Sequence, residues 1–230
     1  MRQLLQQGGM RFKTFLVVRK ISVFLIFGLV LSILSLWLFV GVAEDILEGD
    51  PIVDVDAAFA TELHREATPF STSVYILISS LGAQGIVAVA VVVGLYYALR
   101  RQWLNLIFWI IALGGGILLN ILIKTVIARP RPYFVDPLAL ERSYSFPSAH
   151  SMTSLITYGM LAYFLVVSVR NRYVRIVIVF VAALFIILIG ISRMALGVHY
   201  FSDVLGGFAA GGMWLGICIV AANIMKPRNT

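Results

Sequence analysis

Cysteine and charged side chains are scarce in this chain of 230 residues. Its one cysteine, Cys218, excludes an intrachain disulfide and a zinc site built from cysteine pairs. Only 13% of the residues are Asp, Glu, Lys or Arg, whereas about a quarter are charged in a typical soluble domain. The apolar runs also lack the polar and apolar alternation of a membrane-spanning β-strand. The composition therefore disfavours a soluble domain, a disulfide scaffold and a membrane β-barrel.

Long apolar runs are abundant, and 60% of the residues are hydrophobic. A helix needs about 20 apolar residues to cross a bilayer. Six runs qualify: Ile21–Val42, Val74–Leu99, Leu104–Ile127, Ser151–Val169, Ile176–Ile191 and Val204–Met225. The first is too long for the core of a signal peptide and reads as an uncleaved anchor. We expect an all-α integral membrane protein, a bundle of six transmembrane helices that forms one domain over residues 1–230.

Charge is distributed unevenly between the loops. Four segments hold basic residues and no acidic ones: Arg2, Arg11, Lys13, Arg19 and Lys20; Arg100 and Arg101; Arg170, Arg172 and Arg175; Lys226 and Arg228. The other three loops hold all 11 acidic residues: Glu44, Asp45, Glu48, Asp50, Asp54, Asp56, Glu62, Glu66, Asp136, Glu141 and Asp203. Because basic loops stay in the cytoplasm, both termini should be cytoplasmic and the acidic loops extracytoplasmic. The net charge of +7 then reflects loops beside anionic lipids, and no motif for nucleic acid accompanies it.

Six basic residues remain on the outer side, and three of them lie in KTVIARPRPY, Lys124 to Tyr133. The two Arg-Pro pairs predict the end of the third helix, because the residue before a proline is disfavoured in a helix. For Arg129, a cation that reaches from the helix end to the interface and a residue of a site are equally weighted interpretations. Lys124 fits that explanation less well, because it lies several positions inside the apolar run.

The second unusual segment is SFPSAHSMTS, Ser145 to Ser154, which leads into the fourth apolar run. A helix that begins near Ser148 would offer free backbone N–H groups and the positive end of its dipole to an anion. His150 falls in its first turn. Taken alone, such a histidine is more often structural than catalytic.

The third segment is SRMALGVHYFSD, Ser192 to Asp203, between the last two runs. If the chain is helical from His199 onward, the side chains of His199 and Asp203 share a face. The carboxylate would then accept a hydrogen bond from one ring nitrogen and leave the other free as a nucleophile. The alternative is a surface histidine next to an aspartate that caps the last helix.

All of these segments face the same side, so their polar groups can meet. Lys124, Arg131 and Arg193 supply positive charge, and Ser148 supplies a hydroxyl at a helix start. Such a set suits a phosphoryl group, whose equatorial oxygens carry the charge, with histidines for attack and proton transfer. No carboxylate pair or cluster of histidine and aspartate has the spacing of a metal site. We therefore expect no metal and no cofactor.

Together the three segments resemble the type-2 phosphatidic acid phosphatase family, whose pattern is K-x6-R-P, P-S-G-H and S-R-x5-H-x3-D. The matching residues are Lys124 with Arg131-Pro132, Pro147-Ser148-Ala149-His150, and Ser192-Arg193 with His199 and Asp203. The resemblance covers about residues 104–225, and the six-span layout fits it too. One position departs from the pattern: Ala149 replaces a glycine and loses the freedom to adopt a positive φ.

The resemblance implies roles for these residues. His199 would be the nucleophile that forms a phosphohistidine, with Asp203 orienting it. His150 would protonate the leaving group and then activate water. The phosphate would be held by Lys124, Arg131, Ser148, Arg193 and the backbone of Ala149. Members of this family act without a metal.

Two further features predict packing. The acidic loop over residues 43–70 contains apolar residues at Val53, Ala57, Ala60 and Leu63, which favours an amphipathic helix on the outer leaflet, beside the access route of a lipid. A solvated connector is the alternative, and His64 carries no motif.

In the last run Gly207, Gly211, Gly212 and Gly216 form two G-x-x-x-G spacings. They should pack against the fourth or fifth span rather than form a dimer.

The sequence thus predicts a metal-independent lipid phosphatase at the outer face of a bacterial plasma membrane. Candidate substrates are phosphatidylglycerophosphate, phosphatidate and undecaprenyl diphosphate, and the expected partners are this lipid and the bilayer, without an obligate protein. A lipid phosphotransferase of the same fold is one alternative. A transporter or non-catalytic anion-binding protein is another, which is disfavoured because transport sites lie at mid-membrane.

Overall fold

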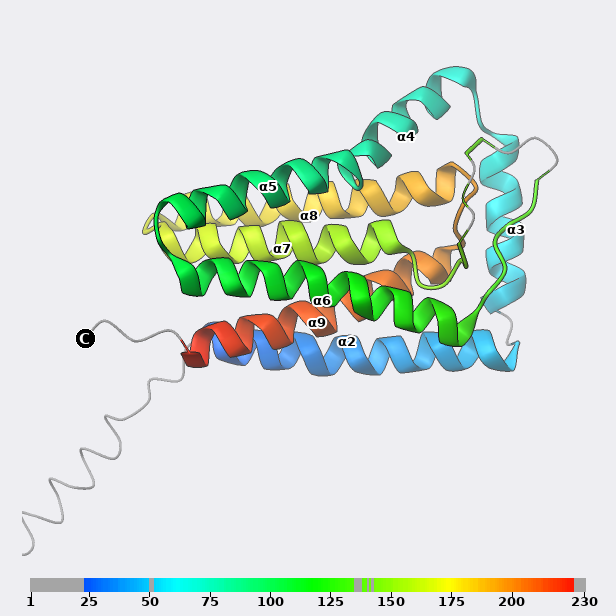
Figure 1. Cartoon of the computed structure of the whole chain (residues 1–230). Coiled ribbons are helices and arrows are strands. Elements are labelled where there is room, and N and C mark those ends of the chain that lie inside the picture. The colour runs from blue at the N-terminus through cyan, green and yellow to red at the C-terminus, as the bar shows by residue number, and fades with distance from the viewer. Residues whose placement is uncertain (1–22, 50–51, 135–137, 140, 142, 226–230) are drawn as a thin grey trace, which may run out of the picture.

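The structure is a computed structural model that describes residues 23–49, 52–134, 138–139, 141 and 143–225. The predicted cytoplasmic basic residues at the chain ends and three loop residues lie outside these ranges: Arg2, Arg11, Lys13, Arg19, Lys20, Lys226, Arg228, Asp50, Asp136 and Arg142. The described elements are all helices (Figure 1): α2 (Val23–Glu48), α3 (Ile52–Arg65), α4 (Pro69–Leu81), α5 (Gln84–Leu99), α6 (Trp103–Ile127), α7 (Ala149–Ser168), α8 (Arg172–Ala195) and α9 (Phe201–Met225).

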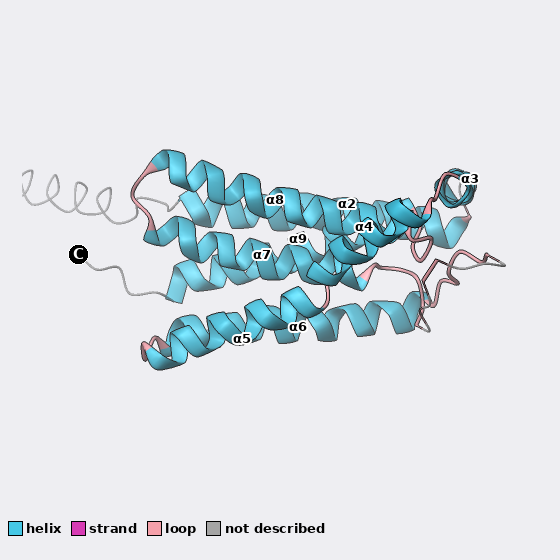
Figure 2. Cartoon of the chain, turned by 90° about the horizontal axis from the view of Figure 1, so that it is seen from above, coloured by secondary structure: helices cyan, strands magenta, loops and turns pink. Residues whose placement is uncertain are grey.

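The six predicted spans are confirmed. The described chain has six helical segments long and apolar enough to cross a membrane, with α4 and α5 counted as one segment from Pro69 to Leu99. They lie roughly parallel in Figures 1 and 2. Large apolar side chains of α2, α5, α6 and α8 remain exposed, such as Trp37, Val92, Ile110 and Phe180. This pattern is expected where lipid tails rather than water surround a bundle.

The first span runs on to Glu48, six residues past the predicted Val42, and the second and fifth spans begin earlier than predicted. The second begins at Pro69, capped by Thr68, and is broken at Gly82 and Ala83. A Cβ at Gly82 would lie 2.6 Å from Cγ2 of Ile189 and 3.0 Å from Cδ2 of His150, so glycine permits the broken helix to approach α7 and α8 closely. The fifth span begins four residues before the predicted Ile176, because the Asn171 side chain accepts from the N–H groups of residues 173 and 174 and caps a first turn that contains arginine.

The last helix, α9, lies at the centre of the bundle and uses its glycines on two sides. A Cβ at Gly207 or Gly211 would lie 2.7 or 2.9 Å from a carbonyl oxygen of α7 or its cap, which confirms packing against the fourth span. Gly212 and Gly216 instead face Ser35 and Ser32 of α2, a contact with the first span that the sequence did not predict. Small residues thus allow close approach on both sides of α9.

The predicted helix in the acidic loop is present as α3, which crosses the end of the bundle at a steep angle (Figures 1 and 2) and packs against α2, α8 and α9. Its buried face was predicted wrongly in one respect: Ala57 is exposed, whereas Ala60 and the charged Asp56 are buried. The solvated-connector alternative is also wrong, because a connector in solvent would not bury a carboxylate.

Candidate active site

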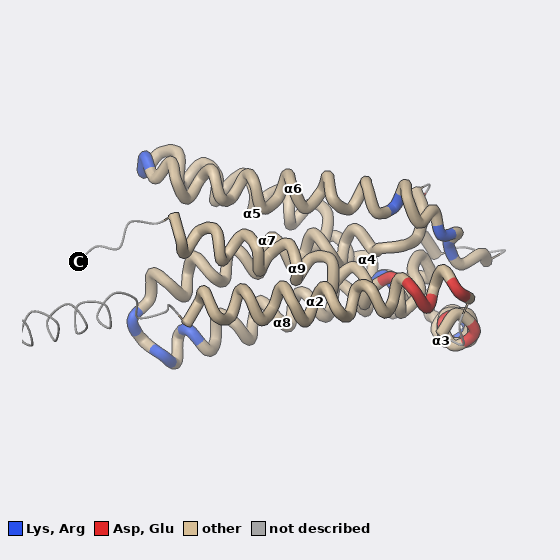
Figure 3. Tube along the Cα trace, turned by 90° about the horizontal axis from the view of Figure 1, so that it is seen from below, with Lys and Arg blue, Asp and Glu red and all other residues tan. Residues whose placement is uncertain are grey.

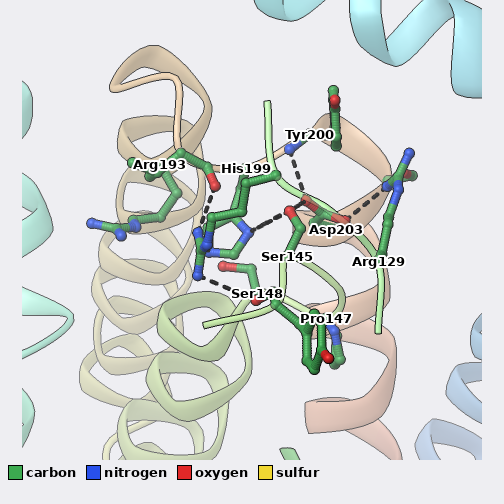
Figure 4. A network of polar contacts seen from close by, with 12 residues as sticks. Arg129, Ser145, Pro147, Ser148, Arg193, His199, Tyr200 and Asp203 are labelled. Carbon is green, nitrogen blue, oxygen red and sulfur yellow. Dashed lines mark hydrogen bonds and ion pairs between the residues drawn. The ribbon is translucent and has the colours of Figure 1, made fainter. Parts of the chain in front are cut away.

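The three motif segments meet at the end of the bundle that α3 crosses. The third span ends where Ala128 adopts a left-handed conformation with φ of 50°, and the Arg-Pro pairs carry the chain away as predicted. Ser148 caps the start of α7, and the loop between α8 and α9 turns at Gly197, with φ of 68°. Figure 4 shows that side chains from the three segments converge here.

His199 is buried, 2% exposed, and each ring nitrogen has a partner. Its Nδ1 lies 3.3 Å from Oδ2 of Asp203, as the spacing predicted, although α9 begins only at Phe201. Its Nε2 lies 3.2 Å from Nη1 of Arg131. Because a guanidinium can only donate, Nε2 carries the lone pair and Nδ1 carries the proton, an assignment made from the hydrogen-bond network. The imidazole is therefore held in the tautomer that a nucleophilic Nε2 requires.

Asp203 serves more than one group. Its Oδ2 accepts the backbone N–H of Tyr200 at 2.9 Å and the hydroxyl of Ser145, and its Oδ1 accepts Nη1 of Arg129 at 2.8 Å. Asp203 thus both faces His199 and caps the start of the last helix, whereas the alternative of a surface histidine is wrong because His199 is buried. With this many donors, the carboxylate stays ionised next to His199.

Burial lowers the pKa of His199 to about 4, against the opposing hydrogen bond and charge of Asp203, and repulsion by Arg131 and Arg193 adds to the decrease. The imidazole is therefore neutral at neutral pH, which is the form that can attack.

Arg193 lies at the end of α8 and is 4% exposed. Its Nη1 donates to Oγ of Ser79 at 2.6 Å and its Nη2 to Oε1 of Glu141 at 2.6 Å. Its Nε is buried and has no hydrogen-bond partner among the described residues. A buried N–H without a partner is costly. Arg193 therefore has one donor available for a ligand.

Glu141 also lies 3.9 Å from Nη2 of Arg131, so one carboxylate faces both arginines. Burial would raise the pKa of the Glu141 carboxyl, but the positive charges of Arg193 and Arg131 outweigh it and lower that pKa. The glutamate thus contacts the two guanidinium groups predicted to hold phosphate. No role for Glu141 or Ser79 was predicted from the sequence.

Lys124 is 8% exposed, so it is not a lysine that reaches the interface. Its Nζ donates to the carbonyl oxygen of Tyr144 and lies 3.5 Å from that of Ser145. It supports the segment that also carries the hydroxyl partner of Asp203. A cavity of about 560 Å³, lined by Lys124, Arg131 and Ser143 among others, lies on this side.

The start of α7 supplies the remaining predicted residues. The Ser148 hydroxyl accepts the N–H of Ser151 at 3.5 Å, so it acts as the N-cap. Ala149 follows at the first helical position and does not adopt a positive φ, so its methyl group adds no backbone strain in place of glycine. His150 is partly buried, and the charges of Arg193, Glu141 and His199 act on it. The seven predicted side chains and the Ala149 backbone therefore lie at one end of the bundle.

For Arg129, the interpretation as a cation that reaches the interface is wrong, and the alternative of a role at the site holds. It is 7% exposed and forms ion pairs with Asp203 and with Asp56 of α3. The sequence contains a weak signal, because Arg129 lies two residues before Arg131 in the same motif. Asp56 had no such signal beyond its place on an apolar helical face.

No group of three or more His, Cys, Asp or Glu in the described part of the chain is placed to hold a metal ion.

Comparisons with known proteins identify the family of this chain. Residues 103–225 match the PAP2 superfamily. Phosphatidylglycerophosphatase B of Bacillus subtilis (strain 168) is 34% identical over 182 residues, which cover 77% of this chain and 88% of that protein.

Two solved structures are similar. The first transmembrane PAP2 type phosphatidylglycerolphosphate phosphatase from Bacillus subtilis has a TM-score of 0.79 and 30% identity, covering 86% of this chain and 98% of that one. Aquifex aeolicus LpxE has a TM-score of 0.55 and 18% identity, covering 74% and 95%. The second likeness supports the fold alone.

Proposed function

The chain belongs to the PAP2 superfamily and is a multi-pass membrane phosphatase, and on this premise we propose that it hydrolyses a lipid phosphate through a phosphohistidine at the outer membrane face. The observation that carries the mechanism is the environment of His199. Its Nδ1 faces Asp203 at 3.3 Å and its Nε2 faces Arg131 at 3.2 Å, in a buried site where the ring is neutral.

In the first step, Nε2 of His199 attacks phosphorus in line with the bond to the leaving oxygen. The N–P bond forms as the P–O bond breaks, and the protonated form of His150 gives its proton to the leaving alcohol. The positive charges of Arg131, Arg193 and Lys124 and the N-terminal amides of α7 stabilise the phosphoryl oxygens. Asp203 stabilises the charge that develops on the His199 ring.

In the second step, the neutral His150 takes a proton from water, and the resulting hydroxide oxygen attacks phosphorus. The N–P bond breaks and inorganic phosphate leaves, so His199 returns to its neutral form. One histidine thus acts first as acid and then as base, which requires that it remain within reach of both the leaving oxygen and the water.

To bind phosphate, Arg131 and Arg193 must exchange some of their present hydrogen-bond partners for phosphate oxygens. Arg131 donates to His199, and Arg193 donates to Glu141. An incoming phosphate would take over these donors and add the Nε–H of Arg193, which has no partner among the described residues. The Glu141 side chain is 32% exposed and lies in a loop, so it can move aside.

The orientation is part of the proposal. Arg100, Arg101, Arg170, Arg172 and Arg175 lie at one end of the bundle, and the acidic residues of α3 and the end of α2 lie at the other, with the site (Figure 3). The positive-inside rule then puts the site outside, in a bacterial plasma membrane, with both termini in the cytoplasm. We treat residues 1–230 as one membrane-embedded domain, since α3 and α9 both contribute to the site.

A lipid tail has a place beside the site. An apolar cavity of about 290 Å³ lies between α5, α6 and α7 and is lined by Thr153, one turn along α7 from His150. A headgroup at His199 would leave its tails in the bilayer next to this cavity. The lipid and the bilayer are the partners that the site requires.

Phosphatidylglycerophosphate is the substrate we propose first, because a relative that is 34% identical and a solved structure that is 30% identical are named for it. The test measures phosphate release by the purified chain in EDTA from this lipid, phosphatidate and undecaprenyl diphosphate. We expect phosphatidylglycerophosphate to have the highest kcat/KM. A higher value for either competitor would reassign the substrate, and absence of release from all three would refute the proposal.

The lowered pKa of His199 predicts a pH dependence of stability. The unfolded chain protonates this residue near pH 6.5 and the folded chain near 4. The unfolded state therefore binds more protons between these values, and up to about 3 kcal/mol of stability is lost as pH falls through that range. In detergent, Tm should fall more steeply between pH 6.5 and 4 for wild type than for His199→Asn, whose side chain does not titrate. Parallel curves would contradict the prediction.

A further inference from the structure

Asp56 is a fully buried carboxylate on a helix whose other side is exposed. Its exposed fraction is 0%, whereas Val55 and Phe59 of the same helix are 62% and 42% exposed. Oδ1 accepts the backbone N–H of Ser202 at 3.0 Å, and Oδ2 accepts the Ser202 hydroxyl and Nη2 of Arg129, the latter at 3.0 Å. A buried carboxylate is costly unless it is paired in this way. Its partners lie on the segment after α6 and at the start of α9.

Arg129 connects Asp56 to the predicted catalytic groups. Its Nη1 donates to Oδ1 of Asp203 at 2.8 Å and to Oγ of Ser202 at 2.7 Å, while Nη2 faces Asp56. Its guanidinium lies over the ring of Tyr200, 4.4 Å from the centroid. Figure 4 shows Arg129 on the side of Asp203 opposite His199. The series Asp56, Arg129, Asp203 and His199 is thus connected by direct contacts.

The division of the guanidinium between two carboxylates has a consequence for His199. Arginine tends to pair with a single carboxylate through two parallel hydrogen bonds. Here Asp56 holds Nη2, so only Nη1 reaches Asp203, at Oδ1. Oδ2 of Asp203 remains for His199. Without the charge of Asp56, Arg129 would be drawn onto both oxygens of Asp203, and the contact of Oδ2 with His199 would weaken.

We propose that Asp56 is a positioning residue for phosphoryl transfer: by holding one side of Arg129, it keeps Asp203 directed at His199. The inference rests on the proposed function, because it requires His199 to be the nucleophile. It gives α3 a part in the reaction through Arg129 and Asp203, which connect Asp56 to His199. Asp56 acts on the rate of chemistry rather than on the capture of the lipid.

The test compares Asp56→Asn with the matched control Asp54→Asn, which makes the same change at an exposed position of the same helix. The amide keeps an acceptor for Ser202 and removes the charge that holds Arg129. We expect D56N to lower kcat about tenfold, the lower end of the range for groups that orient a metal-ligating histidine, and to leave KM unchanged. D54N should match wild type in both constants. Equal kcat in D56N and D54N, or an effect on KM alone, would overturn the inference.

A second comparison keeps the inference testable if D56N does not fold. Asp56, Arg129 and Asp203 carry two negative charges and one positive charge, so Asp56→Asn with Arg129→Gln preserves their net charge. If Asp56 acts through Arg129, this double variant should have the same kcat as R129Q alone. A further tenfold loss in the double variant would overturn the inference. Lack of phosphate release by wild type would instead refute the proposed function, so the two failures are distinguishable.

Discussion

Replacing His199 with asparagine should reduce phosphate release by at least about 10⁴-fold, because the nucleophile cannot be substituted by the remaining groups. The asparagine side chain has an N–H that can still donate to Asp203, which keeps the surrounding hydrogen bonds in place. The loss should therefore appear in kcat, with binding of the lipid and folding retained. The measurement is phosphate release from phosphatidylglycerophosphate by purified protein, with Tm recorded for each variant.

The same variant tests for the covalent intermediate. With ³²P-labelled lipid, wild-type protein quenched in base should retain an acid-labile label, as expected of a phosphohistidine, and H199N should retain none. The control is His64→Asn, since His64 stacks on Phe134 at 4.0 Å between ring centroids and has no proposed role in the chemistry. H64N should label like wild type. Undiminished phosphate release by H199N would remove His199 from the mechanism.

Replacing His150 with glutamine should slow hydrolysis of the natural lipid by about 10²- to 10⁴-fold, the usual contribution of a general acid or base. The two steps should respond differently to the leaving group. A soluble aryl phosphate has a leaving group that needs no proton, so the first step should proceed in H150Q. The second step still needs a base to activate water, and it should remain slow.

The expected result is therefore a burst of aryl alcohol close to one equivalent per protein, followed by slow turnover, with more labelled phosphohistidine at steady state in H150Q than in wild type. The burst is followed by rapid mixing and the label by quenching in base. If H150Q slows the aryl phosphate and the lipid by the same factor and no phosphoenzyme accumulates, His150 does not act as acid and base. Its part would then be confined to binding.

Local patterns were enough to predict several features. The membrane spans follow from runs of apolar residues. A helix that crosses the bilayer needs such a run regardless of which other helices it contacts. The pairing of His199 with Asp203 follows from a spacing of four residues, which brings side chains together near a helix start. The stop after the third span follows from proline chemistry at Arg129 and Arg131.

Features that depend on distant contacts were missed. Gly212 and Gly216 pack against α2, some 180 residues away in sequence, as the 181-residue separation between Ser32 and Met213 illustrates. The second span breaks at Gly82, where the backbone approaches Ile189 and His150 closely. The only local sign of this break in the sequence is the glycine itself. Glu141 was counted only as an acidic loop residue, because nothing in its neighbours indicates that it faces Arg193 and Arg131.

The amino-acid sequence by itself determined that this protein is a helical membrane bundle whose motif residues share one end, since hydrophobic length, charge asymmetry and short spacings act along the chain. Only the tertiary structure decided which charges are buried and with whom. Asp56, Arg129 and Asp203 come from three separate elements, and each is tolerated in the interior only because the others are there. Burial and pairing are properties of the packed chain. The residue type alone therefore could not distinguish a carboxylate of α3 that is exposed to solvent from one that is buried against Arg129.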